Sequence, residues 1–413
     1  MNDDQEHPTL WIRGNKSMSL SGKRIVLAVT GSIAAVRVVE LARELIRNGA
    51  DVHAVMTDAA KHILHPDALH YATGHEVITD ITGDVEHVAF CGLLGCADML
   101  LIAPATANTI GKIASGIDDT PVTTFATTAL GSNIPIIVVP AMHGSMYDHP
   151  AVASNIDRLK EWGIVLIGPE REEGVAKITS NEQIVLEVER ILATADLSWM
   201  KILVTSGATA EPIDPIRIIT NRSSGKTGKH IALEAYRRGA DVTLVHQDHL
   251  GIDGIHEIFV ETAEEMIDAT LAELENGYDI VISAAAISDY TTDASPSKIT
   301  SGLDMVLKLH PTRKLIHLVR KAHPDMTLVG FKAEAGANHD ELMKRAWDTL
   351  EKSCLDLIVA NEVSGGGIGT EDNDVYLIAS GKLPPRHVSG NKRLIACKLL
   401  DMVAEILIHK KAD

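Results

Sequence analysis

The stretch ITNRSSGKTGKHIALEAYRRGADVTLVH (218–245) contains residues that could bind phosphate. Gly225-Lys226-Thr227 precedes a predicted helix, as in the P-loop of kinases and ATPases. A P-loop also needs a glycine five residues before the glycine of Gly-Lys-Thr, where this chain has Thr220, and a strand immediately upstream. The nearest predicted strand, 201–205, lies beyond a long insertion. We therefore reject a P-loop and expect a different phosphate-binding loop here.

A second set of polar residues follows predicted strands in the N-terminal half. Gly31-Ser32-Ile33-Ala34 comes after a buried strand and opens a helix, where backbone N–H groups and the helix dipole favour a phosphate. The chain has no Gly-x-Gly-x-x-Gly here, so the dinucleotide fingerprint is absent. A purely structural turn explains the glycine equally well. The ends of neighbouring strands would line the same crevice and offer uncharged groups that suit FMN: Thr57, Ala105, Thr106 and Asn108.

Two further segments carry groups that could bind substrate or move a proton. His87 lies in GDVEHVAF, but the chain has 19 histidines, so its type alone says little. The segment PAMHGSMYDHP (140–150) follows a buried strand, where binding loops belong. It contains Met142, His143 and Met146. A packed loop with satisfied polar groups is the competing interpretation.

Composition excludes several classes of protein. A chain of 413 residues suggests roughly two or three domains. The formal charge of −18 and the 3% of aromatic residues argue against nucleic acid as a partner. Four cysteines make neither a disulfide framework nor a common zinc pattern. We see no signal peptide and no apolar run long enough for a membrane span, so we expect a cytoplasmic protein without a membrane partner.

The elements that position these residues follow one plan in both halves. Residues 22–60 and 200–247 each read as strand, turn, amphipathic helix and strand, and both helices end in Gly-Ala-Asp-Val. Such units make parallel sheets with ligands at the carboxyl ends of the strands. We predict a tandem α/β chain: an N-terminal extension (1–22), one domain at 23–193 and a second at 200–413.

The first domain resembles the homo-oligomeric flavin-containing cysteine decarboxylases. TGSIAA, EHV, APATANTIGKIASGIDD and PAMHGSMYDHP match that family in order over 23–180. The resemblance implies a flavodoxin-like fold, trimers with FMN at a subunit interface and a role for His87 in decarboxylation. Flavin suits this reaction because loss of CO2 leaves a carbanion that needs an electron sink. FMN contacts are expected at Gly31, Ser32, Ile33, Thr57, Ala105, Thr106 and Asn108, and substrate contacts at Met142, His143, Met146 and Lys177.

Two departures from that family leave alternatives open. His143 stands where bacterial members have asparagine, and the stretch 168–180 lacks the cysteine that the family carries in a flexible lid. Lys177 or water could replace that cysteine as proton donor. The domain could instead resemble a flavin prenyltransferase, or serve only as a flavin-binding oligomerisation module.

The second domain resembles phosphopantothenate–cysteine ligase. TSGATAEPIDPIRIITNRSSGKTG matches the ligase signature, and AAAISDY, SPSKI, VGFKAE and DLIVANEVSGGGIGTEDNDV follow in order over 200–405. The resemblance implies that Asn221 holds the reacting carboxyl group or its acyl-nucleotide, and that Lys298 stabilises developing negative charge. CTP contacts are expected at Gly207, Ser223, Ser224, Gly225, Ser283, Ala284, Ala285, Asp289, Lys298, His310, Phe331 and Lys352. His310 begins a stretch that reads His-Pro-Thr-Arg where the family has Asn-Pro-Asp-Ile. Lys352 only partly matches the family's pair of helical lysines before the final strand, because the register is shifted by a residue.

The two resemblances imply a bifunctional enzyme of coenzyme A synthesis, because the ligase product is the decarboxylase substrate. Its small-molecule substrates would be 4′-phosphopantothenate, cysteine and CTP, although CTP and ATP are not distinguished by the sequence. Mg²⁺ would be held by nucleotide phosphates and water rather than by protein side chains. A homo-oligomer with trimeric flavin domains and dimeric ligase domains is expected.

Overall fold

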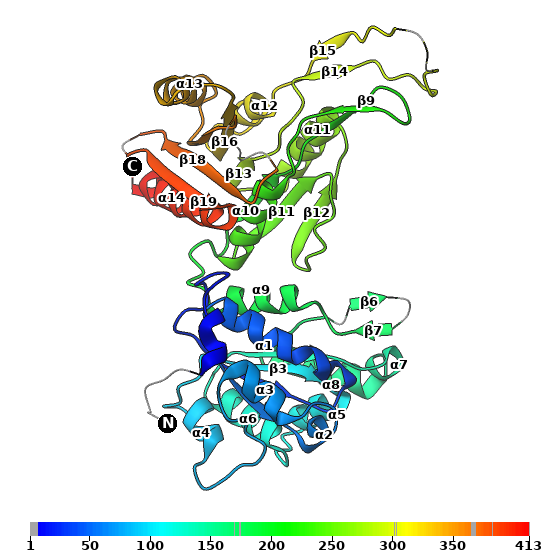
Figure 1. Cartoon of the computed structure of the whole chain (residues 1–413), viewed down its shortest axis with the longest axis vertical. Helices are drawn as coiled ribbons and strands as arrows, with labels where there is room; N and C mark the ends of the chain where they lie inside the picture. Colours follow the sequence, from blue (N-terminus) through cyan, green and yellow to red (C-terminus); the bar gives the residue numbers. More distant parts are fainter. Residues whose placement is uncertain are drawn as a thin grey trace. The chain divides into compact units, whose positions relative to one another are not determined.

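The computed structural model describes residues 7–168, 170–172, 175–300, 302, 304–364, 369–381 and 383–412, with only the backbone at 170–172, 175–177, 411 and 412. The chain forms two compact units, Met1–Ala193 and Thr194–Asp413 (Figure 1). No described helix is both long enough and apolar enough to cross a membrane.

The first unit is built on a five-stranded parallel sheet. Its strands, in spatial order, are β2 (Asp51–Met56), β1 (Arg24–Val29), β3 (Met99–Ala105), β4 (Ile136–Pro140) and β5 (Val165–Leu166). The order 2-1-3-4-5 is that of flavodoxin-like folds, which confirms the expected fold class. Its topological switch point lies between β1 and β3, so a ligand crevice is expected at the carboxyl ends of these two strands.

Helices cover both faces of this sheet because successive strand residues point to opposite sides. Ile25, Leu27 and Val29 of β1 pack with α1, α3 and α9, whereas Val26 and Ala28 pack with α5, α6 and α8. The other elements are η1 (Pro8–Ile12), η2 (Ile33–Arg37), α1 (Val38–Arg47), α2 (Asp58–Lys61), α3 (Pro66–Thr73), α4 (Glu86–Cys91), α5 (Ala107–Ala114), α6 (Pro121–Gly131), α7 (Gly144–Tyr147), α8 (Pro150–Glu161), β6 (Glu170–Glu172), β7 (Val175–Lys177) and α9 (Asn181–Leu192).

The second unit contains an eight-stranded sheet. Its order is β12 (Ile255–Phe259), β11 (Asp241–His246), β8 (Lys201–Thr205), β13 (Ile280–Ser283), β16 (Thr327–Glu334), β17 (Leu357–Glu362), β18 (Asp372–Ala379) and β19 (Arg386–Asn391). The first six are parallel, and the last two add antiparallel. In chain order the parallel strands read 3-2-1-4-5-6, which is the Rossmann order and confirms the expected fold. The switch point lies between β8 and β13.

Helices again cover both faces of the sheet, and two short hairpins extend from it (Figure 1). Helices α10 and α14 contact each other and the sheet, while α11, α12 and α13 contribute to the hydrophobic cluster that contains Leu203 and Val281. The remaining elements are α10 (Lys226–Arg237), α11 (Ala263–Leu274), α12 (Leu315–Ala322), α13 (His339–Lys352), α14 (Lys392–Ala412), the hairpin β9 (Ala210–Pro212) with β10 (Ile218–Thr220), and the hairpin β14 (Tyr290–Thr292) with β15 (Leu309–Pro311).

Candidate active sites

The crevice of the first unit forms where the turns after β1 and β3 meet. The Thr30 hydroxyl donates a hydrogen bond to the Pro104 carbonyl (2.7 Å) and accepts one from the backbone N–H of Thr106 (3.0 Å). The Thr106 hydroxyl in turn accepts from the Thr109 N–H (3.3 Å) and so caps α5. These bonds fix the two turns against each other at the switch point of the sheet.

A close backbone approach brings the turn after β2 to the same place. A Cβ at Gly31 would lie 2.5 Å from the Ala59 Cβ, so only glycine fits against the start of α2. Thr57 caps α2 by accepting from the Ala60 N–H (3.3 Å). The Ser32 hydroxyl donates to the Ala141 carbonyl (3.0 Å), which ties the segment after β4 to the crevice.

Three sequence-predicted flavin residues have clear positions around this crevice. Ala105 is buried in the core, Asn108 is exposed in the first turn of α5, and the Ile33 side chain is 76% exposed at the start of η2. The crevice therefore combines uncharged hydroxyl and amide groups with backbone N–H groups and one exposed aliphatic side chain. That donor set fits a flavin, because an uncharged ring needs apolar and hydrogen-bonding contacts without a strong local charge.

The segment after β4 keeps its predicted residues near one another. Met142 packs against the core, and Met146 is 49% exposed. His143 caps α7, since its Nδ1 accepts from the Ser145 N–H (3.4 Å) and lies 2.9 Å from the Ser145 hydroxyl. Lys177 ends β7, and its side chain lies outside the described residues.

His87 is not brought to the crevice of its own chain. It lies on α4, whose last turn is tied to the residues just before β3 by the bonds from Cys96 N–H to Ala89 O (3.2 Å) and Ala97 N–H to Phe90 O (2.9 Å). Those residues mark the amino edge of the sheet, whereas the crevice lies at its carboxyl edge, and Figure 1 shows α4 far from α2, α5 and α7. The polar-to-apolar pattern around His87 could not reveal to which edge of the sheet α4 is attached.

His87 lies beside exposed apolar side chains, and one of its ring nitrogens has no hydrogen-bond partner among the described residues. In the described part of the chain its Nδ1 is buried without a hydrogen-bond partner, and its ring lies edge-on to Phe125 at 6.5 Å between centroids. Exposed apolar side chains stand on and beside the same helix: Val85, Val88, Leu93 and Leu94.

The site of the second unit is a pocket of about 770 Å³ at the switch point between β8 and β13. Three glycines let the turn after β8 approach the start of α10. Gly207 and Gly225 have φ of +97° and +69°, and a Cβ at Gly225 would lie 2.9 Å from the Gly207 Cα. A Cβ at Gly228 would lie 2.5 Å from the Ser206 Cβ. The Ser206 hydroxyl also donates to the Gly225 carbonyl (2.8 Å).

The loop after β13 is bonded to the same turn. The Ala286 N–H donates to Gly207 O (2.8 Å), and the Ser288 N–H donates to the Thr209 hydroxyl (2.9 Å). The Asn221 amide donates to Ala286 O (3.0 Å), so the Asn-Arg-Ser-Ser-Gly stretch closes over this loop. The opening motif of the sequence thus lies on the wall of a nucleotide-sized pocket.

Most of the predicted nucleotide residues meet in this pocket. Its wall includes Asn221, Ser223, Ser224, Gly225, Ser283, Ala284, Ala285, Asp289 and Phe331. Gly207 supports the wall from behind without lining it. Lys298, His310 and Lys352 do not line it.

The three residues outside the pocket belong to elements that point elsewhere. Lys352 is exposed in the last turn of α13. His310 lies on β15 and pairs with Asp293 (Nε2–Oδ2, 3.4 Å). Lys298 is exposed in the connection between β14 and β15, where the next residue, Ile299, donates its N–H to the Asp214 carboxylate (3.1 Å). A residue that follows a strand closely in sequence can therefore lie outside the pocket, because a hairpin places it elsewhere.

Sequence reasoning missed most of the positive charge in the pocket. Six cations line it although the whole chain carries a net charge of −18: Arg222, Lys226, Arg313, Lys314, Lys332 and Lys392. Lys332 directly follows Phe331 at the carboxyl end of β16, a position that could have been found from the strand pattern. Lys392 has no local signal, because only the antiparallel return through β18 and β19 brings it here.

Four of these cations are held by partners within the same unit. Lys226 pairs with Glu371, Lys314 with Asp289, and Lys332 with Glu334 (3.0 Å). Lys392 is 3% exposed and bonded to the Thr370 carbonyl, and burial lowers the pKa of its ammonium group. A basic, partly desolvated pocket suits an anion of high charge, such as a polyphosphate.

The two units belong to two known domain families. Residues 13–193 match the family Flavoprotein, and residues 197–407 match the family described as DNA/pantothenate metabolism flavoprotein C-terminal domain. The chain is therefore a flavoprotein unit followed by a unit of pantothenate metabolism.

Full-length relatives define the family more closely. The chain is 48% identical over 408 residues to the coenzyme A biosynthesis bifunctional protein CoaBC of Thermococcus kodakarensis (97% of this chain and 100% of that one). It is 39% identical over 406 residues to the protein of the same name from Methanocaldococcus jannaschii (97% and 98%). A solved C-terminal domain of a CoaBC protein is 26% identical, with a TM-score of 0.44, and covers 52% of this chain and all of that one.

The chain belongs to the CoaBC family of bifunctional enzymes of coenzyme A biosynthesis. The family identification made from the ordered motifs is confirmed, with a flavin unit that acts as decarboxylase and a second unit that acts as ligase. A ligase carried on an inactive scaffold, or on a prenyltransferase-like domain, is not favoured by relatives that match both units over nearly their whole length.

Proposed function

We propose that the pocket between β8 and β13 binds CTP and joins 4′-phosphopantothenate to cysteine. The single observation that carries this proposal is the set of six cations around a pocket built at a Rossmann switch point in an acidic chain. The glycine-rich start of α10 offers backbone N–H groups to phosphate oxygens. Mg²⁺ would bind mainly to phosphate oxygens and water.

The reaction needs a leaving group on the carboxyl carbon. The carboxylate oxygen of 4′-phosphopantothenate attacks the α-phosphorus, pyrophosphate leaves, and the cysteine amine then displaces CMP from the acyl-cytidylate. Asn221 lines the pocket beside the loop after β13 and would orient the acyl group. Lys226, Lys314 and Lys332 are point charges that can stabilise the negative charge as it moves from the carboxylate to the pyrophosphate.

Lys298 would serve the ligase only after the β14–β15 connection changes position or a second chain contributes. The β9–β10 and β14–β15 hairpins carry exposed apolar side chains: Ile216, Ile218, Tyr290, Val306 and Leu309. Exposed apolar residues on extended hairpins suit a contact between two copies. We therefore propose dimeric ligase units, with Lys298 near that contact.

For the first unit we propose FMN as the flavin, bound in the crevice between β1 and β3. When bound, FMN supplies the reversible two-electron oxidation that lets the substrate carbon carry charge as CO2 leaves. The chain's own groups would orient the substrate: Met142, His143 and Met146 belong to the segment after β4, which the Ser32 hydroxyl ties to the turn after β1.

A trimer would complete this site. His87 sits at the opposite edge of the sheet from the crevice, among exposed Val88, Leu93 and Leu94. We propose that this surface of one chain covers the crevice of the next, so that His87 acts on substrate bound to a neighbouring chain. Lys177 or water would return the proton in the absence of a lid cysteine.

Supplying the intermediate tests the two halves separately. The protein would be given chemically made 4′-phosphopantothenoylcysteine without nucleotide, and CO2 and 4′-phosphopantetheine would be measured. A parallel ligation assay would compare CTP with ATP. The proposal expects CO2 at a catalytic rate without nucleotide, and ligation that is faster with CTP; ligation with ATP alone would overturn the choice of nucleotide.

A further inference from the structure

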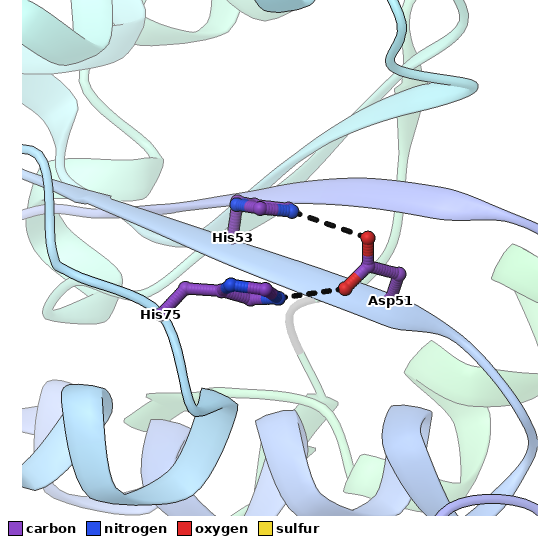
Figure 2. Close-up of side chains that lie close together, drawn as sticks. All are labelled: Asp51, His53 and His75. Carbon is purple, nitrogen blue, oxygen red and sulfur yellow. Dashed lines mark hydrogen bonds and ion pairs between the residues drawn. The ribbon is translucent and has the colours of Figure 1, made fainter. Parts of the chain in front are cut away.

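Two histidines and an aspartate converge at the amino edge of the first sheet, whereas the flavin crevice of the same unit lies at the carboxyl edge (Figure 2). The Asp51 carboxylate lies 3.2 Å from His53 Nε2 through Oδ2 and 2.7 Å from His75 Nε2 through Oδ1. The two imidazole rings stack with centroids 3.9 Å apart and planes 15° apart. Both Nε2 atoms therefore face one carboxylate.

The backbone places these three side chains on one face. Asp51 and His53 are two residues apart on β2, so they point to the same side of the sheet. Helix α3 ends at Gly74, whose φ of +75° turns the chain back toward β2. The His75 N–H then lies 3.3 Å from the Thr73 hydroxyl, and Ile78 forms a parallel bridge with Val55.

The donor atoms lie slightly further apart than the ligands of a metal centre. One ligand atom from each residue lies within 4.8 Å of the other two. Ligands of a tetrahedral zinc ion, at about 2.0–2.2 Å from the metal, lie about 3.4 Å from one another. Closure around an ion therefore needs the three side chains, all of them partly exposed, to rotate toward one another.

The chemistry of the set selects the class of metal. Two neutral imidazoles and one carboxylate suit Zn²⁺ and related divalent transition ions rather than Mg²⁺ or Ca²⁺, which prefer oxygen ligands. Each imidazole would carry its proton on Nδ1 and present the Nε2 lone pair to the ion. Water would occupy the fourth position.

Two nearby arginines contact the Asp51 carboxylate and still allow it to bind an ion. Arg24 Nε donates to Asp51 Oδ2 (3.0 Å), and the Arg13 guanidinium lies 3.8 Å from Oδ1. In a metal centre with Asp51 bound through Oδ1, Arg24 keeps its bond to the other oxygen and orients the carboxylate, as outer hydrogen bonds do at many metal sites. The Arg24 side chain is 39% exposed, so solvent screens its repulsion of the ion.

We propose that Asp51, His53 and His75 bind one divalent transition-metal ion, with Zn²⁺ as the natural occupant. The ion would join the edge strand β2 to the chain that follows α3. Asp51 starts β2 and the crevice lies beyond its last residue, about 17–20 Å further along a six-residue strand. The ion would therefore lie too far from the crevice of its own chain to touch FMN there, and we assign it a structural role that strengthens the flavin unit.

Metal binding by the full-length chain tests this proposal. Protein treated with a chelator would be titrated with Zn²⁺ by calorimetry and with Co²⁺ by visible absorption, and the melting temperature of the flavin unit would be recorded with and without Zn²⁺. We expect one tight site per chain and a higher melting temperature with Zn²⁺. His53→Gln and His75→Gln should each weaken Zn²⁺ binding at least about 100-fold.

A matched control separates this site from ordinary surface histidines. His65 forms an exposed pair with Asp67 (Nδ1–Oδ2, 3.4 Å), and among the described residues no second imidazole joins that carboxylate in a metal-binding group. His65→Gln should leave tight binding and the Zn²⁺ effect on melting unchanged. Circular dichroism and flavin content would show that each variant is folded. Equal Zn²⁺ affinity in all three variants, or no binding tighter than that of a free surface histidine, would overturn the proposal.

Discussion

Gly228→Ala should disable the ligase through a single methyl group. Gly228 lies in the first turn of α10, and a Cβ there would stand 2.5 Å from the Ser206 Cβ and 3.0 Å from the Ser206 Cα. Because backbone is among the clashing atoms, a side-chain rotation cannot relieve the contact. Helix α10 must move away from β8, and the Gly225 carbonyl moves with it, away from the Ser206 hydroxyl.

The expected cost follows from these contacts. Overpacking costs about 1–3 kcal/mol, and loss of the Ser206–Gly225 hydrogen bond adds about 1 kcal/mol. Alanine recovers about 1 kcal/mol of helix propensity. The second unit should lose about 1–3 kcal/mol of stability. The ligation kcat/KM should fall at least about 100-fold, because displacement by about 1 Å is enough to misplace reacting groups.

Gly111→Ala is the matched control for this substitution. Gly111 also lies inside a helix, α5, but its added Cβ would meet only the Asn155 amide nitrogen, at 3.4 Å. This variant should be as stable as the original chain or more so, and ligation should be unchanged. Both variants would be followed by thermal unfolding and by CMP release. Normal ligation in Gly228→Ala would refute the claim that this close approach shapes the pocket.

Three further predictions concern single side chains. Asn221→Ala should lower amide formation at least about 10-fold while CO2 release from supplied intermediate is unchanged, because only the pocket loses a donor; unchanged ligation would remove Asn221 from the mechanism. His87→Asn should reduce CO2 release at least about 100-fold with ligation intact, and mixing it with a crevice variant such as Thr106→Val should restore part of the activity if the site spans two chains; full activity in His87→Asn would contradict its role. Burial lowers the pKa of His230 from 6.5 to about 4, so the unfolded chain binds its proton first and stability is lost as the pH falls from about 6.5 to about 4, by up to about 3 kcal/mol. In His230→Phe, denaturant unfolding should show a smaller loss over that range, and an identical pH profile would show that His230 does not cause it.

Strand patterns and turn glycines were sufficient to predict the two sheets. The apolar runs 201–205 and 278–290 end in small and polar residues, and those ends meet at the switch point as parallel strands require. Local sequence carries this information because a strand, its turn and the next helix are continuous in the chain. The resemblance to the ligase family, rather than the strand pattern, singled out Ser283 and Phe331, and both lie on the pocket wall.

Positions that depend on long-range packing could not be predicted from the local sequence. Lys298 lies near Asp289 in sequence, yet the β14–β15 hairpin carries it out of the pocket. Lys392 enters the pocket only through the antiparallel strands β18 and β19. The position of His87 is set by α4, which lies at the amino edge of its sheet. The position of α4 depends on its connection to β3, and no sequence pattern near His87 reveals it.

The most direct test of the account is the coupled reaction in the full-length protein. It would receive 4′-phosphopantothenate, cysteine, CTP and Mg²⁺, and CMP, CO2 and 4′-phosphopantetheine would be measured over the same time course. The account predicts equal final amounts of all three, and none of them when CTP is left out. CMP without CO2, from protein that still holds its flavin, would contradict the claim that one chain carries out both reactions.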